Sequence, residues 1–198
     1  NAVTNINMSG WNTQNVTDMS EMFYWCRKLE TLDLRNWKTG NVKNMSGMFH
    51  GCESLSNLEI SGIDTTNVTD MSNMFRNCRS IATLDLRSFV TPALVNVRSM
   101  FRECSELETL NISGFDSTSI EHVSYMFKGC SKISTIYSPA AFTKTVALPA
   151  VYEGTNGGMY GTIPRNLTES IVLVYARDLQ PGESGDPAPA SSISDAKI

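Results

Sequence analysis

The hydrophobic positions of the chain repeat every 26 residues. In each unit a Met-Phe pair is followed three residues later by Cys, and Leu or Ile comes three residues after that. The pairs are Met22-Phe23, Met48-Phe49, Met74-Phe75, Met100-Phe101 and Met126-Phe127. A fixed period of about 20 to 50 residues is typical of a solenoid, in which each unit buries its apolar side by stacking on its neighbours.

The hydrophobic spacing changes within each unit, which predicts two elements per unit. From Val16 to Cys26 the apolar residues follow in steps of three and four, the spacing of one face of a short helix. From Leu32 to Leu34 they alternate with a polar residue, which indicates a short strand with one buried face. Short side chains that can cap a first helical turn mark the start of this element in four units, and a histidine, a weaker cap, does so in the fifth: Asp18, Asn44, Asp70, Asn96 and His122.

Stacking of such units predicts a parallel sheet on one side and short helices on the other. A partial additional rung is expected at the start, where Ile6, Met8 and Trp11 match the positions of Leu32, Leu34 and Trp37. We therefore predict an α/β solenoid of five full rungs and one partial rung over residues 1–138.

The repeat is lost after residue 138. Three runs rich in β-forming residues follow, at 143–148, 159–163 and 171–175, separated by turns that contain Gly or Pro. We expect them to form a small β cap over residues 139–179 that covers the last rung, because an open strand edge invites pairing with other chains. Residues 180–198 are rich in Pro, Gly, Ser and Ala, which is typical of a linker or tail.

The spacing Leu29-x-x-Leu32-x-Leu34-x-x-Trp37 resembles the leucine-rich repeat. Units such as NVTDMSEMFYWCRKLETLDLRNW are similar to the 26-residue bacterial surface protein repeat, the BspA-like or mycoplasma-lipoprotein type, over residues 5–138. The resemblance implies a right-handed solenoid that belongs to a secreted, wall-anchored or lipid-anchored bacterial protein. It implies a role in adhesion and no catalytic residue.

The charge of the chain narrows the range of partners. The 16 basic and 20 acidic residues are dispersed along the sequence and give a net charge of -4, so no basic stripe is expected for a nucleic acid. No apolar run approaches the roughly 20 residues that span a bilayer, so we expect no membrane insertion by this segment. The sequence opens at Asn1 without a signal-peptide pattern, which indicates a processed chain or a fragment.

The cysteines form a column of their own. One falls in each unit, at Cys26, Cys52, Cys78, Cys104 and Cys130. Neighbouring Cβ vectors in one column run parallel, which disfavours the disulfide dihedral of about 90°, so we predict a ladder of buried free thiols, with disulfides as the alternative. The sequence contains no CxxC pair and no column of histidines beside the cysteines, so we expect no metal and no cofactor.

Catalysis is not expected either. His50 and His122 lie in different columns, and neither has a Ser or Cys partner in register. An enzyme whose site lies in the cap is retained only as a third hypothesis, behind two non-catalytic ones.

The best candidate for function is the solvent face of the predicted sheet. Its outward positions form an acidic or polar column beside a column that contains arginines, and the candidate ligand-binding residues are Asp33, Arg35, Glu59, Asp85, Arg87, Asn111 and Tyr137. These would present charged groups to a protein partner. The alternative is that the Asp-Arg pairs only neutralise each other and keep the sheet soluble.

A second candidate lies on the opposite face. Tyr24 and Trp25 are aromatic where the other units have mostly polar or glycine residues. They would form an aromatic anchor for a partner, or they pack against a segment that precedes the first unit.

These observations predict a non-catalytic binding module on the bacterial cell surface. Its partner would be a host or matrix protein, or a surface protein of another cell, bound through the sheet face. The alternative is a structural spacer that projects another domain from the cell.

Overall fold

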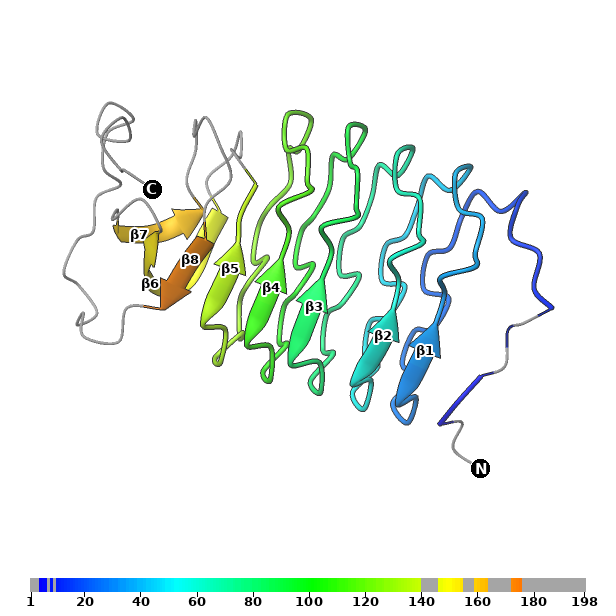
Figure 1. The fold of residues 1–198 in the computed structure, drawn as a ribbon, viewed down its shortest axis with the longest axis horizontal. Helices are drawn as coiled ribbons and strands as arrows, with labels where there is room; N and C mark the ends of the chain where they lie inside the picture. The colour runs from blue at the N-terminus through cyan, green and yellow to red at the C-terminus, as the bar shows by residue number, and fades with distance from the viewer. Residues whose placement is uncertain are drawn as a thin grey trace.

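The computed structural model describes residues 4–6, 8, 10–139, 146–154, 159–163 and 172–175. The chain coils into a row of similar rungs, with one short strand of each rung on the same side (Figure 1). The strands of the repeats are β1 (Thr31–Asp33), β2 (Asn57–Glu59), β3 (Thr83–Asp85), β4 (Thr109–Asn111) and β5 (Thr135–Tyr137).

The strands pair in parallel and in the register that the repeat predicts. Thr31 lies opposite Asn57, and Thr83 lies opposite Thr109, so each step along the sheet is 26 residues. The partial rung that precedes the five full rungs is also present, because Asn5 forms a parallel bridge with Thr31 and the Trp11 ring stacks on Trp37 at 5.9 Å between centroids. Rungs are numbered below from the first full rung, which contains β1. The solenoid with a parallel sheet is therefore confirmed.

The sheet is interrupted between β2 and β3. Strands β1 and β2 form one sheet, whereas β3, β4 and β5 belong to another. In the part of the chain that the structure describes, no backbone hydrogen bond joins β2 to β3, and the two arrows stand visibly farther apart than their neighbours (Figure 1). The sequence differs here as well, since Asn57 replaces the Thr that begins each of the other four strands. Asn is poorly suited to a strand compared with the β-branched Thr.

This interruption predicts a local difference in hydrogen exchange. The Thr83 and Asp85 amides face β2 without a ladder partner, whereas the matching Thr109 and Asn111 amides face β3 within a paired ladder. We expect Thr83 and Asp85 to exchange at least about tenfold faster than Thr109 and Asn111. Amide exchange followed by NMR measures all four sites, and equal protection would contradict the interruption.

The predicted helices are wrong: no helix occurs in the described residues, and turns occupy the predicted positions. Alternate amides in this segment donate to the next rung instead of to the carbonyl four residues back. The Met19 amide donates to the Asn44 carbonyl at 2.9 Å, and the Phe23 amide donates to the Met48 carbonyl at 2.9 Å. A second ladder of hydrogen bonds between rungs, which we call the turn ladder, therefore replaces the helix.

The backbone of the turn ladder explains how a three-four spacing arises without a helix. Glu21 and Trp25 have left-handed φ values of 56°, and the residues at the same two positions of every later rung are left-handed as well. The amides of Tyr24 and Cys26, near these two residues, donate to the carbonyls three residues back. Each rung thus turns every four residues and presents Met and Phe inward, as a helix would, while its other amides remain free for the neighbouring rung.

The column predicted to cap the helices has a related local role. The Asp18 carboxylate accepts a hydrogen bond from the Ser20 amide at 2.7 Å, and Asn44 accepts one from the Ser46 amide at 2.9 Å. These are side-chain turns of the kind that Asp and Asn favour. The column also links the rungs, because the Asn96 amide group donates to the Asp70 carboxylate at 3.0 Å.

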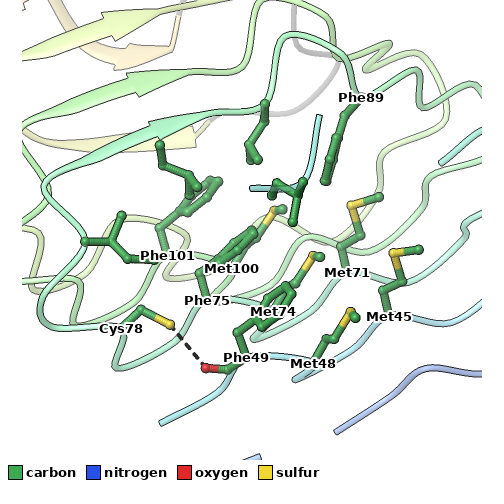
Figure 2. Packing of buried hydrophobic residues seen from close by; sticks show 14 of the residues in the cluster. Met45, Met48, Phe49, Met71, Met74, Phe75, Cys78, Phe89, Met100 and Phe101 are labelled. Atoms are coloured by element: carbon green, nitrogen blue, oxygen red, sulfur yellow. Dashed lines mark hydrogen bonds between the residues drawn. The ribbon is translucent and has the colours of Figure 1, made fainter. Parts of the chain in front are cut away.

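The core is a set of ladders that run along the solenoid. The Phe rings of the Met-Phe pairs stack with centroids 5.4 to 5.8 Å apart from Phe23 to Phe127. Buried Met side chains lie beside this stack (Figure 2). A polar column that the hydrophobic pattern did not indicate is also buried, and in it the Thr39 hydroxyl donates to the Asp64 carbonyl at 2.9 Å and accepts from the Asp64 amide at 2.8 Å.

The cap consists of β6 (Val146–Gly154), β7 (Met159–Ile163) and β8 (Val172–Tyr175). Strand β8 pairs antiparallel with β5, so the last rung of the solenoid has a covered edge, as expected. The first strand of the cap differs from the predicted run, because it begins at Val146 and continues to Gly154. Residues 180–198, predicted to be a linker or tail, lie outside the described residues, and the division into domains stays a prediction.

Candidate functional site

The outward side chains of the strands form the sheet face, which contains the seven residues named as candidates. The Asp33 and Arg35 side chains form an ion pair with Oδ2 and Nη2 2.7 Å apart, and Asp85 and Arg87 form the same pair at 2.7 Å. Both pairs are well exposed to solvent. Each arginine lies in the turn that follows its strand, where its own amide donates to the aspartate carboxylate, at 3.0 Å for Arg35 and 3.1 Å for Arg87, and this turn brings the two side chains together.

The first ion pair is reinforced by hydrogen bonds. The Arg35 guanidinium donates to both carboxylate oxygens of Asp33, and the Arg35 amide donates to one of them at 3.0 Å. Hydrogen bonds from the Arg35 side chain and amide lower the pKa of Asp33 to about 2. The pair therefore remains charged through the physiological range, and this face offers fixed charges in place of a titrating switch.

Glu59 lies in the same acidic column but differs from its two neighbours. Its own rung has Ser61 where the first and third have Arg35 and Arg87. In the described part of the chain Glu59 forms no ion pair. The Glu59 carboxylate still interacts with Arg35. The hydrogen bond and charge of Asp33 raise the pKa of Arg35 most, and the charge of Glu59 adds a smaller increase.

Two grooves lie on the sheet face. The first has a volume of about 810 Å³ and runs over β1, where the rings of Trp11 and Trp37 lie beside Asp33 and Arg35. The second, of about 410 Å³, lies over the gap between β2 and β3, with Leu58, Glu59, Asp85 and Arg87 in its walls. Glu59 lines both grooves. Five of the seven candidate residues are thus placed around two neighbouring hollows.

The other two candidates lie apart from these grooves. Asn111 accepts hydrogen bonds from the Ser113 amide at 3.1 Å and hydroxyl at 2.7 Å, so its carboxamide oxygen is already engaged. Tyr137, on β5, is 39% exposed, and its backbone pairs with Asn111 on one side and Val172 of β8 on the other.

The Tyr24 and Trp25 pair lies on the turn ladder, where it packs on the second rung. The rings of Tyr24 and Trp25 lie 4.9 and 5.6 Å from the ring of His50, and the Arg27 guanidinium lies 4.3 Å from the Trp25 centroid. The indole also covers Gly51, where a Cβ atom would come within 2.7 Å of the ring. Both aromatic residues keep solvent exposure, 44% for Tyr24 and 36% for Trp25.

The five cysteines are free, and four of them are buried. Each buried thiol donates to the Phe carbonyl of the preceding rung at 3.0 to 3.1 Å, and Figure 2 shows this bond from Cys78 to Phe49. Burial raises the pKa of Cys52 and of Cys130 to about 12. Cys26, in the first rung, is only partly buried, although burial raises its pKa as well. The column therefore acts as a structural ladder.

The thiol ladder predicts selective alkylation. At pH 8 the buried thiols are protonated, because their raised pKa values lie well above this pH, and they are shielded from solvent. Iodoacetamide should therefore modify Cys26 in the folded protein at least about a hundredfold faster than Cys52 or Cys130. Mass spectrometry of the folded and denatured protein measures the labelling, and equal labelling of all five sites in the folded state would contradict the ladder.

Comparison with known proteins identifies the repeat. Residues 1–109 and 52–140 match the family model described as "Mycoplasma protein of unknown function, DUF285". The chain belongs to this family. The result confirms the mycoplasma, BspA-like type of leucine-rich repeat that the 26-residue units indicated. The DUF285 match spans the whole described solenoid and assigns no activity to it.

One solved structure is similar to the DUF285 chain. It is the leucine-rich repeat protein of T. pallidum, TpLRR, with 19% sequence identity and a TM-score of 0.44. The similarity covers 63% of this chain and 53% of that protein, so the chain spans about half the length of TpLRR. No protein with curated annotation matches this DUF285 chain.

The described residues also bear on the predictions about membrane insertion and metal binding. No helix in them is long and apolar enough to cross a membrane. No group of three or more His, Cys, Asp or Glu side chains in them is arranged to hold a metal ion.

The sequence prediction missed the second groove. It named Glu59, Asp85 and Arg87 as outward residues of a continuous sheet, whereas the structure places them around a gap in that sheet. One signal was present: Asn57 breaks a column that is otherwise Thr. A single polar substitution does not reveal whether a ladder of hydrogen bonds forms, so this signal alone was insufficient.

Proposed function

We propose that this DUF285 protein is a non-catalytic binding module of the bacterial cell surface that holds a protein partner against its sheet face. The observation that carries the proposal is the pair of grooves on that face, lined by five of the outward residues. The groove over β1 offers the exposed Trp11 ring, which stacks on the buried Trp37, beside an exposed ion pair, and Trp and Arg are residues on which protein interfaces commonly depend.

The rigidity of the surface supports the same proposal. Backbone hydrogen bonds, the Phe stack and the Thr column each connect one rung to the next, so the outward side chains stand on a scaffold that is ordered before binding. A preorganised surface loses little conformational freedom on association, which favours affinity. Fixed charges of both signs favour a partner with a complementary pattern.

The test begins with the whole chain displayed on a cell or bead and exposed to host matrix proteins and to surface proteins of other bacteria. For a captured protein, the double variant Arg35→Gln/Arg87→Gln should weaken binding at least about tenfold, because each groove loses the ordered Asp-Arg pair that presents its charges. The control Lys28→Gln/Lys43→Gln removes the same charge from exposed positions outside the grooves. An equal loss in both variants, or none in either, would contradict a site on the sheet face.

A spacer role is the second candidate, supported by the uniform stacking of the rungs. On the turn ladder and in the Phe stack each rung adds the same kinds of contact, so the solenoid can project a further domain at a fixed distance from a surface. In that case deletion of 26-residue units should leave adhesion of the intact surface protein unchanged. It should not respond to the Arg35→Gln/Arg87→Gln substitutions.

A further inference from the structure

The groove between β2 and β3, which we call the seam groove, has an apolar wall. The Leu residues at the centres of β1, β3 and β4, and the Ile of β5, are buried to 3% exposure or less. Leu58, at the centre of β2, is only partly buried, and it lines the groove. The interruption of the sheet thus uncovers one hydrophobic side chain in a hollow of about 410 Å³.

The seam groove also contains backbone groups without partners. In the intact ladders of this sheet, the amides and carbonyls of alternate residues point to the next strand. By this alternation the carbonyls of Ser56 and Leu58 face β3, and those of Thr83 and Asp85 face β2. None of these four carbonyls accepts a hydrogen bond in the described part of the chain. The groove therefore offers several acceptors that folding has left available, together with unpaired amides such as those of Thr83 and Asp85.

The seam groove carries a net negative charge. Glu59 has no ion pair among the described residues, and the Asp85 carboxylate on the opposite wall is already neutralised by Arg87 at 2.7 Å. One uncompensated carboxylate therefore lies beside the free carbonyls and the Leu58 side chain. The Glu59 carboxylate favours an occupant with a positive charge, and the free carbonyls favour one that also carries several hydrogen-bond donors.

The shape of the gap limits the size of that occupant. On the turn ladder the same two rungs are closed, because the Met45 amide donates to the Asp70 carbonyl at 2.9 Å and Asn44 forms a parallel bridge with Asp70. The Phe49 and Phe75 rings stack at 5.4 Å within the core. The rungs therefore separate only at the sheet face, and the gap is a wedge closed at its inner side, which favours a side chain over a whole inserted strand as its occupant.

We propose that the seam groove receives an arginine side chain of the protein partner. The inference rests on the proposed function, since it assumes that the sheet face binds a protein, and it names the part of that face that is recognised. The aliphatic stem of the arginine packs on Leu58, as long cationic side chains commonly do on apolar surface. The guanidinium donates to the Glu59 carboxylate and to free carbonyls of the gap, for which its five planar N–H donors are suited.

The direct test uses N-acetyl-arginine amide as the probe and the whole chain labelled with ¹⁵N. Titration should shift the amide signals of residues 58–60 and of 83–85. N-acetyl-citrulline amide has nearly the same shape without the charge, so it should bind at least fivefold more weakly. The Glu59→Gln variant should weaken arginine binding at least fivefold, whereas Glu121→Gln, an exposed change of equal charge on the turn ladder, should leave it unchanged.

Three results would overturn the inference: equal binding of the citrulline probe, shifts confined to the groove over β1, or an unchanged affinity in Glu59→Gln. The spectrum of Glu59→Gln also shows whether the variant is folded. This test is independent of the partner screen. If Arg35→Gln/Arg87→Gln weakens partner binding while the arginine probe leaves the seam groove unaffected, the proposed function stands and the arginine site is wrong.

Discussion

The substitution Phe75→Ala is expected to lower the free energy of unfolding by about 3 to 5 kcal/mol, the usual range for removing a buried aromatic ring. Phe75 is fully buried and lies at the centre of the Phe stack, between Phe49 at 5.4 Å and Phe101 at 5.8 Å. Its removal takes contacts from two interfaces between rungs at once, and the rungs on either side cannot close the space without breaking the turn ladder.

Denaturant unfolding followed by circular dichroism measures this loss. Val90→Ala is a suitable control, because Val90 is 56% exposed and its truncation should change the free energy of unfolding by less than about 0.5 kcal/mol. A loss below about 1.5 kcal/mol for Phe75→Ala would show that the Phe stack contributes much less than its burial indicates.

The substitution Gly62→Ala should cost about 2 kcal/mol or more, within or above the range for overpacking a close contact. A Cβ atom at Gly62 would overlap the backbone carbonyl of Arg35 in the preceding rung. Backbone cannot move aside as a side chain can, so the first two rungs would have to separate near β1 and β2, the paired strands of the smaller sheet.

Ser88→Ala provides the matched control for this second change. Ser88 occupies the same column one rung later and already has a Cβ atom, so its replacement should alter the free energy of unfolding by less than about 0.5 kcal/mol. If thermal and denaturant unfolding gave Gly62→Ala the stability of the unsubstituted protein, the close approach to Arg35 would not be a constraint on the fold.

The candidate site was predictable in its composition but not in its shape. The alternation around Leu32 and Leu34 was sufficient to place Asp33, Arg35, Asp85 and Arg87 on the solvent face. The Asp-Arg contacts form in the turn after each strand, where the arginine amide bonds to the aspartate two residues before it. The hollows depend on contacts between rungs: Trp11 stacks on Trp37 from one unit to the next, and the seam groove exists because two strands fail to pair. The hydrophobic pattern within one unit indicates neither the tryptophan stack nor the unpaired strands.

The helix prediction failed for a related reason. Steps of three and four residues report only which side chains are buried, and a chain that turns every four residues buries the same ones. The choice between the two backbones depends on where the amides of Met19, Glu21 and Phe23 find acceptors, and these acceptors lie in the following rung. Stacking also supplies the buried Thr column with its partners, because the Thr39 hydroxyl reaches Asp64, 25 residues away.

By itself, the sequence determined the period, the register and the identity of the buried columns, since identical spacing forces equivalent residues into contact once the units stack. The tertiary structure alone decided that the turn segments are a ladder and not helices, and that the sheet opens between β2 and β3. Both outcomes depend on hydrogen bonds between residues about 26 positions apart, and the geometry of such bonds is fixed only when neighbouring rungs are in place.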